Sequence, residues 1–420
     1  MTAVHDFPEK SGSASNATAR VLADRAAGEA YVASVCFKHG PPRLLGVELE
    51  YTVHYAGDPA RPLDPDDLAT ALGPHTPRTL RPESPASPLP GGSPLSLEPG
   101  CQVEISAHPQ TTLRELDAVV SADLAHLTAL LAGKGLVLGE SGIDEHRAPE
   151  RKLRTERYAA MERRFAPLGE GGITMMCSTA GLQICVDTGE ADAYAGRWAA
   201  VHAMGPPLLA TFANSRFHAG RDTGFASARW LAVMGTEETR VRPGAASADP
   251  AASWAHRILD TPLMVLPGDN RPWDAPDGLT FADWIDGHGT DPLLSRPTEQ
   301  DLAYHLTTMF TPVRPQGYLE VRYLDAQPAG QWLHPVALVA GLLARPSTVD
   351  KVLDICAPVA NRWDTAARAG LADPAIAAVA AEVVDLGCAE LGVTGLSTAV
   401  VGEISESVQA RVHGSRSYQR

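Results

Sequence analysis

The sequence predicts an α+β fold in which residues 43–325 supply a sheet and residues 332–420 form helices that cover it. Within the first region, apolar and polar residues alternate in four separate segments, which is the pattern of strands with one face in a core. From Trp332 onward the chain is rich in alanine, leucine and valine at helical spacing and carries no cluster of reactive side chains. We expect residues 21–420 to form a single domain, preceded by a flexible tail over residues 1–20.

Two glutamates share one face of the first strand-like segment, residues 43–55. Apolar side chains occupy every second position of this segment: Leu45, Val47, Leu49, Tyr51, Val53 and Tyr55. Glu48 and Glu50 lie at alternate positions, so both point to the opposite face. Carboxylates about 7 Å apart repel each other unless a cation lies beside them, and Mg²⁺ is often held by one or two carboxylates. This strand alone leaves two interpretations open, a magnesium site and a solvated polar face.

Three later segments repeat this arrangement of polar side chains. Their polar positions are Gln102 and Glu104 in residues 95–109, Gln183 in residues 173–187, and Glu320 and Arg322 in residues 317–325. If the four strands are neighbours in one sheet, their polar faces merge into an oxygen-rich surface that can hold more than one Mg²⁺. Such a surface is suited to a polyphosphate ligand.

The segments between these strands carry helix and turn signals. Helices are predicted over residues 21–37, 112–131, 191–213 and 299–310. Thr112 and Glu115 form a capping box for the second helix, and Pro206-Pro207 must bend or break the third. Recurrent prolines predict a long loop over residues 73–94. Residues 240–298 are predicted to be loops with short elements at 263–266 and 281–285.

A basic segment, Arg147 to Arg164, interrupts an otherwise acidic chain. Its cations are Arg147, Arg151, Lys152, Arg154, Arg157, Arg163 and Arg164, in a loop that enters a helix. Such a run is a candidate for binding an anion. For most of these side chains we favour the alternative, a solvated helix face paired with Glu150, Glu156 and Glu162.

Charge and composition exclude several classes of protein. The 420-residue chain has a net charge of -15, which argues against nucleic acid or an anionic membrane as its main partner. It contains no apolar run of membrane-spanning length and no apolar signal core in its first 20 residues, so we expect a cytoplasmic protein. Six scattered cysteines without a C-x-x-C pair predict reduced thiols, most of them buried. P-loop, HExxH and GxSxG motifs are absent, which removes support for P-loop, zinc-protease and serine-hydrolase chemistry.

Five motifs, in order along residues 43–330, resemble those of the glutamate-cysteine ligases of the plant and bacterial carboxylate-amine ligase group. They are Gly46-Val-Glu-Leu-Glu50, Glu98-Pro-Gly-Cys-Gln-Val-Glu104, Ser178-Thr-Ala-Gly-Leu-Gln183, Ala213-Asn-Ser with Thr223-Gly-Phe-Ala-Ser-Ala-Arg229, and Tyr318-Leu-Glu-Val-Arg-Tyr-Leu-Asp325. The chain is most similar to the ligases of this group that supply ergothioneine synthesis. It departs from the second motif at Cys101, where glycine or alanine is common.

The resemblance implies a glutamine-synthetase-like fold, with a curved, largely antiparallel sheet whose concave face holds ATP and two or more Mg²⁺ ions. Helices cover the back of such a sheet. It also implies an enzyme with one catalytic ligase domain, in which ATP phosphorylates the γ-carboxylate of L-glutamate. The amine of L-cysteine then attacks this γ-glutamyl phosphate to give γ-glutamylcysteine.

The same resemblance assigns roles position by position. The implied Mg²⁺ ligands are Glu48, Glu50, Glu104 and Glu320. Arg322 is the implied phosphate partner and, with Glu320, the implied catalytic pair, while Gln183 lies near the nucleotide. Gln102, Arg229 and Arg216 are the implied substrate-binding residues.

Two alternatives remain open: a ligase of the same fold with another amine acceptor, and a glutamate- and ATP-binding protein without catalysis. The full set of acids favours an enzyme, because a binding protein has no need of several metal ligands. The acceptor is determined least, since one buried group changes discrimination by about 1–3 kcal/mol. We expect a monomer that binds L-glutamate, L-cysteine and ATP, with neither nucleic acid nor a membrane as partner.

Overall fold

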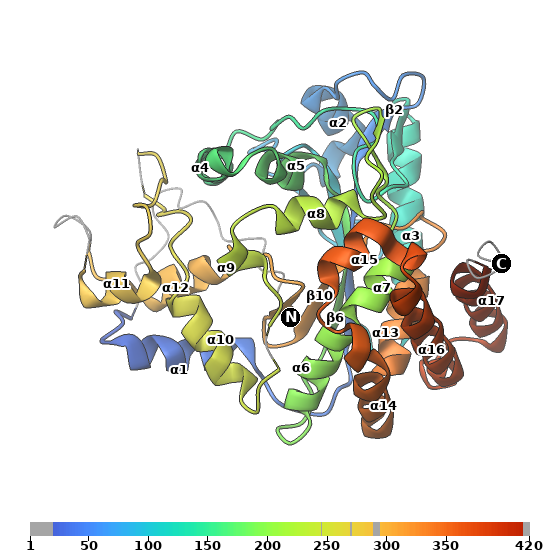
Figure 1. The fold of residues 1–420 in the computed structure, drawn as a ribbon. Coiled ribbons are helices and arrows are strands. Elements are labelled where there is room, and N and C mark those ends of the chain that lie inside the picture. The colour runs from blue at the N-terminus through green and yellow to red at the C-terminus, as the bar shows by residue number, and fades with distance from the viewer. Residues whose placement is uncertain (1–19, 245, 269–270, 289–294, 415–420) are drawn as a thin grey trace.

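Six antiparallel strands form the central sheet of the computed structural model, which describes residues 20–244, 246–268, 271–288 and 295–414 (Figure 1). In spatial order the strands are β3 (Leu95–Leu97), β4 (Val103–Ser106), β1 (Leu45–Tyr51), β6 (Gly181–Val186), β10 (Leu319–Asp325) and β9 (Val313–Pro315). The predicted α+β fold with an antiparallel sheet is therefore confirmed. The predicted flexible tail lies almost entirely outside the described residues.

The register of the strands sets the polar side chains side by side. Glu50 on β1 lies opposite Glu104 on β4, and Glu48 lies opposite Gln183 on β6. On the far side, Glu320 of β10 lies between Cys185 of β6 and Arg314 of β9. Since side chains alternate between the two faces of a strand, all these polar groups share one face.

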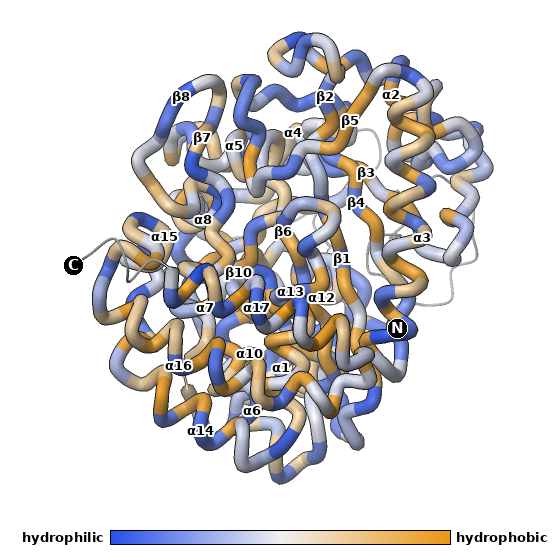
Figure 2. The backbone as a smooth tube through the Cα atoms, turned by 90° about the vertical axis from the view of Figure 1, so that its right-hand side faces the viewer, coloured by the Kyte–Doolittle hydropathy of each residue, from blue (hydrophilic) through white to orange (hydrophobic). Residues whose placement is uncertain are grey.

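Helices cover the apolar face of the sheet. Packed against it are α3 (Leu113–Ala132) on β1, α13 (Leu333–Leu342) on β6 and α7 (Gly205–Thr211) on β10. In turn α16 (Pro374–Glu390) packs on α13 and α7, and α17 (Thr398–Gly414) packs on α16. Hydrophobic and hydrophilic stretches alternate along α16 and α17 (Figure 2), as expected for helices with one face in a core, whereas α13 is buried on all sides.

Several smaller elements complete the fold around the sheet. The remaining helices are α1 (Arg25–Cys36), α2 (Pro65–Leu72), α4 (Glu156–Phe165), α5 (Gly171–Ser178), α6 (Tyr194–Ala203), α8 (Ala228–Met234), α9 (Glu238–Val241), α10 (Pro250–Leu259), α11 (Phe281–Asp286), α12 (Glu299–Leu306), α14 (Pro346–Cys356) and α15 (Trp363–Ala369). Two small two-stranded sheets pair β2 (Val53–Tyr55) with β5 (Leu136–Leu138) and β7 (Phe217–His218) with β8 (Arg221–Asp222). Among the described residues no helix is both long and apolar enough to cross a membrane.

The helix signals of the sequence are largely confirmed. Thr112 caps α3 by accepting a hydrogen bond from the backbone of Glu115, whereas the Glu115 carboxylate accepts from the hydroxyl of Thr111, so one half of the predicted capping box forms. The predicted long helix breaks into α6 and α7 immediately before Pro206-Pro207. All six cysteines are free, and five of them are buried.

Three local predictions are wrong. Residues 43–55 are not one strand, because the chain breaks at Thr52 and β2 pairs with β5 instead of extending the main sheet. Residues 173–187 begin as helix α5, since a short apolar run does not by itself distinguish a strand from a helix. Residues 240–298 contain the amphipathic helix α10, which Asp249 caps and Pro250 begins. Both are favourable residues at a helix start, but the Pro- and Gly-rich composition of this region obscured that signal.

Candidate active site

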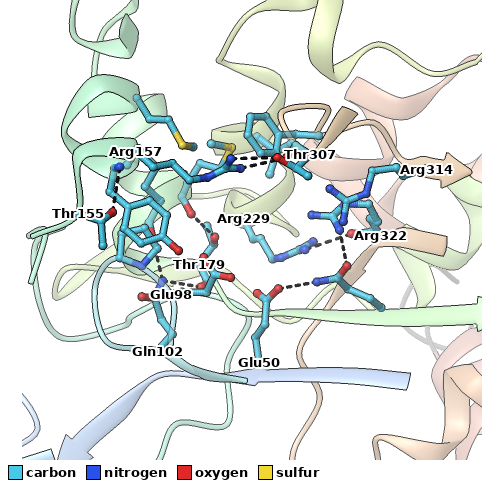
Figure 3. A pocket seen from close by; sticks show the side chains of 18 of the residues that line it. Glu50, Glu98, Gln102, Thr155, Arg157, Thr179, Arg229, Thr307, Arg314 and Arg322 are labelled. Carbon is cyan, nitrogen blue, oxygen red and sulfur yellow. Dashed lines mark hydrogen bonds between the residues drawn. The ribbon is translucent and has the colours of Figure 1, made fainter. Parts of the chain in front are cut away.

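A cavity of about 250 Å³ lies over the polar face of the sheet (Figure 3). Its floor comes from the strands, the β3–β4 turn and α8, through Glu50, Glu98, Gln102, Gln183, Arg229, Arg314 and Arg322. Its opposite wall is mostly apolar and aromatic, and includes Tyr158, Met161, Met175, Met176, Trp230, Trp273, Tyr304 and Phe310. A mostly apolar pocket with a few convergent polar groups is the usual form of a small-molecule site.

Acidic side chains gather at one end of the floor. Carboxylate oxygens of Glu50, Glu98 and Glu104 lie within 4.8 Å of one another. Glu104 is fully buried and accepts hydrogen bonds from the hydroxyls of Ser96, at 2.8 Å, and Ser106, at 2.9 Å. Glu50 and Glu98 reach the cavity itself. Three carboxylates this close require positive charge nearby, and their all-oxygen donor set suits a hard cation such as Mg²⁺.

A second group lies deeper, and none of its members lines the cavity. It brings together one ligand atom each from Glu48, Cys185 and Glu320, again within 4.8 Å of one another. All three side chains are buried. Burial raises the pKa of the Cys185 thiol well above its usual value, and the two neighbouring carboxylates raise it further. The sulfur is therefore a neutral thiol, and the oxygens of Glu48 and Glu320 are the better donors for a hard cation.

Arginines occupy the other end of the floor. The Oε2 atom of Glu320 accepts hydrogen bonds from Nε of Arg314, at 2.8 Å, and from Nη1 of Arg322, at 2.9 Å. Burial acts to raise the pKa of Glu320, but the two guanidinium groups outweigh it and lower that pKa to about 2. Glu320 is thus a carboxylate that orients two cations at the cavity.

Gln183 connects the acidic end to the basic end. Its amide nitrogen donates to Oε1 of Glu50 at 2.8 Å, and its amide oxygen accepts from Nη1 of Arg322. The backbone nitrogen of Gly181 holds the other oxygen of Glu50 at 2.6 Å. A neutral amide satisfies both charged neighbours at once, which neither a carboxylate nor an apolar side chain would do.

Arg229 projects into the cavity from the first turn of α8. Ser227 caps that helix and also donates to Asp325, whose carboxylate lies 3.9 Å from Nη1 of Arg229. Nη2 of Arg229 donates to the backbone oxygen of Arg322 at 3.1 Å, while Nε and Nη1 make no hydrogen bond with the described residues. Burial lowers the pKa of Arg229. A buried guanidinium with unused donors at a cavity wall is a site for an anionic ligand.

Two of the expected substrate-binding residues do not present free polar atoms to the cavity. Gln102 lines the wall, but its side-chain oxygen accepts from the backbone of Gly100 at 2.9 Å and its nitrogen donates to the backbone oxygen of Thr179 at 2.9 Å. Arg216 does not line the cavity, because it forms a bidentate ion pair with Asp222 in the exposed β7–β8 region. The structure therefore brings Arg229 to the site and leaves Arg216 outside it.

The basic segment behaves mostly as a paired surface. Its ion pairs join Arg147 to Asp144, Arg151 to Glu162, Lys152 to Glu150, Arg163 to Asp274, and Arg164 to Glu237 and Asp277. Arg157 is the member that lines the cavity, where it donates to the hydroxyl and the carbonyl of Thr307 at 2.9 and 3.2 Å. Most cations of this segment are therefore ion-paired, which supports the interpretation that they form a paired surface and do not bind an anion. Several of their partners lie far away in the sequence.

Glu98 and Arg314 are cavity residues to which the sequence alone gave no role. Glu98 lies at the β3–β4 hairpin, where its backbone nitrogen donates to the backbone oxygen of Gln102 at 2.9 Å. The position of Glu98 at the start of the same Pro-Gly turn that precedes Glu104 was the signal available for it. Arg314 lies on a three-residue strand, which is too short to show a periodicity.

Cys101 occupies a strained position in the same hairpin. Its backbone φ is 67°, in the left-handed region, and its side chain is buried. Glycine adopts this conformation without a steric cost, whereas other residues do not. This backbone geometry is the physical reason that a glycine fits here better than a cysteine.

Comparisons with known proteins agree with the motifs. A family model described as glutamate-cysteine ligase family 2 matches residues 44–397. Glutamate-cysteine ligase EgtA of Mycobacterium tuberculosis is 37% identical over 360 residues, which cover 84% of this chain and 80% of that protein. EgtA of Mycolicibacterium smegmatis is 36% identical over 352 residues, covering 82% and 79%. The chloroplastic glutamate-cysteine ligase of Medicago truncatula is 32% identical over 278 residues, covering 64% and 53%.

One solved structure resembles the fold more distantly. The crystal structure of a glutamate-cysteine ligase from Francisella tularensis, in complex with AMP, superimposes with a TM-score of 0.51 at 13% identity. The superposition covers 90% of this chain and 82% of that one. At this identity the likeness concerns the fold alone.

Proposed function

The chain belongs to glutamate-cysteine ligase family 2, and from this premise we propose that it joins the γ-carboxylate of L-glutamate to the amine of L-cysteine at the expense of ATP. The product is γ-glutamylcysteine, and the similarity to the EgtA proteins supports a role in ergothioneine synthesis. The family predicted from the five sequence motifs is the family that the comparisons show.

One observation carries the proposal: the cavity floor is divided into an acidic end and a basic end. Glu50, Glu98 and Glu104 form the first, while Arg229, Arg314 and Arg322 form the second. Transfer of a phosphoryl group to a carboxylate brings two anions together, so catalysis consists mainly of alignment and neutralisation. A floor with both signs of charge serves a metal-bound polyphosphate whose γ-phosphoryl group points toward the basic end, where the anionic acceptor also binds.

The acidic residues fit Mg²⁺ as cofactor. We propose Glu50, Glu98 and Glu104 as ligands of one ion and Glu48 with Glu320 as ligands of another. The hydroxyls that hold Glu104 and the backbone amide that holds Glu50 keep these carboxylates in place without an ion. When bound, Mg²⁺ neutralises phosphate oxygens and orients them for in-line transfer.

Three protein groups contribute directly to the reaction that we propose. Arg229 binds a carboxylate of L-glutamate through its guanidinium group, and Arg322 contacts the phosphates of ATP. Gln183 keeps Glu50 and Arg322 apart and correctly oriented. Gln102 shapes the cavity but does not bind substrate, because its side-chain amide is already hydrogen-bonded to the backbone. Arg216 is not part of the proposed site, because it is paired with Asp222 outside the cavity.

The two chemical steps follow from this placement. An oxygen of the γ-carboxylate attacks the γ-phosphorus of ATP, and the bond to the β,γ-bridging oxygen breaks to release ADP. The cysteine amine then attacks the acyl carbon, and inorganic phosphate leaves. The apolar wall of Met175, Met176, Trp230 and Phe310 keeps water from hydrolysing the acyl phosphate between these steps.

The broader expectations stay part of the proposal. We propose one catalytic domain over residues 21–420, supported by the larger of two hydrophobic clusters, whose buried members run from Leu22 to Val412. The net charge of -15 supports a partner set of small molecules without nucleic acid or membrane. A cytoplasmic monomer remains our proposal for location and assembly.

An acceptor panel tests the proposed reaction. Purified protein with MgATP and L-glutamate receives L-cysteine, 2-aminobutyrate, L-serine or L-alanine, while phosphate release is followed and product mass is measured. We expect cysteine to give the fastest release, with 2-aminobutyrate as the nearest partial substrate. A preference for an amine without a thiol would support the alternative of a ligase with another acceptor. Nucleotide binding without any phosphate release would support a non-catalytic binding protein.

A further inference from the structure

Arg314 is buried in the cavity floor, beside Glu320 on the neighbouring strand. The two residues are a register pair of strands β9 and β10, and Nε of Arg314 donates to Oε2 of Glu320 at 2.8 Å. Its Nη1 donates to the backbone oxygen of Met309 at 3.4 Å, and its Nη2 makes no hydrogen bond with any described residue. Figure 3 shows this guanidinium group beside Arg322 and directed into the cavity.

Three arginines at this end of the cavity share few contacting carboxylates. Arg229, Arg314 and Arg322 line it, and the carboxylates in contact with them are those of Asp325 and Glu320. Because Glu320 accepts from both Arg314 and Arg322, neither guanidinium group has a carboxylate of its own. Buried guanidinium donors that lack a full set of partners favour an anionic ligand in the cavity.

Glu320 fixes the spacing of the two arginines that share it. Its Oε2 atom accepts one hydrogen bond from Nε of Arg314 on the adjacent strand. The same atom accepts another from Nη1 of Arg322, two residues along its own strand. The remaining donors of both groups therefore face the cavity from two sides of one carboxylate. Two guanidinium groups held in this way match the geometry of a phosphoryl group, whose oxygens accept from several directions.

We propose that Arg314 is a second catalytic arginine, which contacts the γ-phosphoryl group of ATP from the side opposite Arg322. The inference rests on the proposed function and adds a residue to it. In the alternative, Arg314 only neutralises Glu320 and touches no substrate. The two cases differ in whether loss of Arg314 weakens the binding of the γ-phosphate.

A nucleotide series tests this contact directly. Affinities of AMP, ADP and a non-hydrolysable β,γ-imido analogue of ATP are measured by calorimetry, with Mg²⁺, for the wild-type protein and for Arg314→Gln. We expect the affinity for the ATP analogue to fall about tenfold or more, while AMP and ADP stay within about twofold. Turnover should fall about 100-fold or more, with the KM for cysteine unchanged. Equal losses for all three nucleotides, or no loss for any, would overturn the proposal.

A matched control separates this effect from the loss of any buried ion pair. Arg164 is also ion-paired and mostly buried, through Glu237 and Asp277, but it does not line the cavity. Arg164→Gln should leave the ratio of ATP-analogue to ADP affinity unchanged. If Arg314→Gln does not fold, Arg314→Lys answers the same question, because lysine can pair with Glu320 but has no second donor arm for the phosphate.

Two other results would also contradict the inference. A rise in the KM for L-glutamate without a change in nucleotide affinity would mean that Arg314 binds the substrate carboxylate. Wild-type turnover in Arg314→Gln would mean that Arg314 has no part in the reaction. The proposed function fails separately, if the wild-type protein releases no phosphate in the acceptor panel.

Discussion

Glu50 and Glu104 face each other directly across the β1–β4 ladder, as a register pair on the polar side of the sheet. Like charges in directly opposite positions destabilise a sheet. The chain nevertheless holds both carboxylates firmly, Glu50 through the amide of Gly181 and Glu104 through the hydroxyls of Ser96 and Ser106. Because the fold keeps two repelling carboxylates in these positions, we infer that they bind a cation, which suits their oxygen donors.

We predict that Glu104→Gln abolishes turnover without destabilising the metal-free protein. The change removes one member of the repulsive group and keeps the side-chain shape, so the melting temperature without Mg²⁺ should stay equal or rise slightly. Adding Mg²⁺ should raise the melting temperature of the wild-type protein and have much less effect on the variant, because a ligand that binds only the folded state stabilises it. Thermal shift assays with and without Mg²⁺ measure both effects.

The exposed Glu403 on α17 provides the control for this prediction. Glu403→Gln changes the net charge by the same amount, far from the cavity, and should leave the response to Mg²⁺ intact. An unchanged Mg²⁺ response in Glu104→Gln would remove this residue from the metal site.

The local alternation of residues was enough to predict which side chains share the polar face. Glu48, Glu50, Glu104, Gln183 and Glu320 all lie on it, because the direction of a strand side chain depends only on its position within the strand. The sequence did not reveal which strands are neighbours, since pairing depends on contacts between distant segments. The family resemblance supplied that step.

The parts of the site that were missed lack local periodic signals. Arg314 lies on a three-residue strand and becomes significant only when β9 pairs with β10. Arg216 and Arg229 belong to the same stretch of sequence but lie in different places. Ser227 starts α8, which directs Arg229 into the cavity, whereas an ion pair with Asp222 keeps Arg216 outside it. Such outcomes follow from tertiary contacts and cannot be predicted from spacing.

The left-handed backbone at Cys101 predicts an unusual order of stability among its variants. Both Cys101→Ala and Cys101→Gly lose the buried thiol, so their difference isolates the cost of a side chain at a φ of 67°. We expect the glycine variant to be more stable than the alanine variant by about 1 kcal/mol. Chemical denaturation of the two variants gives this difference, and the exposed Ala122 of α3 serves as control, because Ala122→Gly should destabilise by about 1 kcal/mol.

Buried neutral histidines predict a loss of stability in mild acid. Burial, and to a lesser degree the charge of Arg240, lower the pKa of His305 to about 3, whereas an unfolded histidine has a pKa of about 6.5. Between these values the unfolded chain binds a proton that the folded chain does not, so stability falls as the pH falls. In the wild-type protein the free energy of unfolding falls between about pH 6 and about pH 5. His305→Gln should reduce the slope of this fall by about 1 kcal/mol per pH unit.

Denaturation curves at several pH values measure this slope, which matters more than the absolute stability of the variant. His256 offers a control because its side chain is 56% exposed and has no comparable burial. His256→Gln should leave the slope as it is in the wild-type protein. An unchanged slope in His305→Gln would show that His305 is not the neutral, buried group that we describe.

Gly181 and Arg229 provide the most specific test of substrate binding. A Cβ atom added at Gly181 would lie 2.2 Å from Nη2 of Arg229, so Gly181→Ala must displace the guanidinium group. We predict a rise of about tenfold or more in the KM for L-glutamate, with the KM for ATP nearly unchanged, because a shift of about 1 Å in a positioning group is enough to weaken a substrate contact. Gly46, also a glycine of the central sheet, is the matched control, since a Cβ there would meet its nearest neighbour, Cys185, at 3.4 Å. Steady-state kinetics of Gly181→Ala and Gly46→Ala therefore separate displacement of Arg229 from a general effect on the sheet, and equal glutamate KM values in the two variants would contradict a role for Arg229 in binding glutamate.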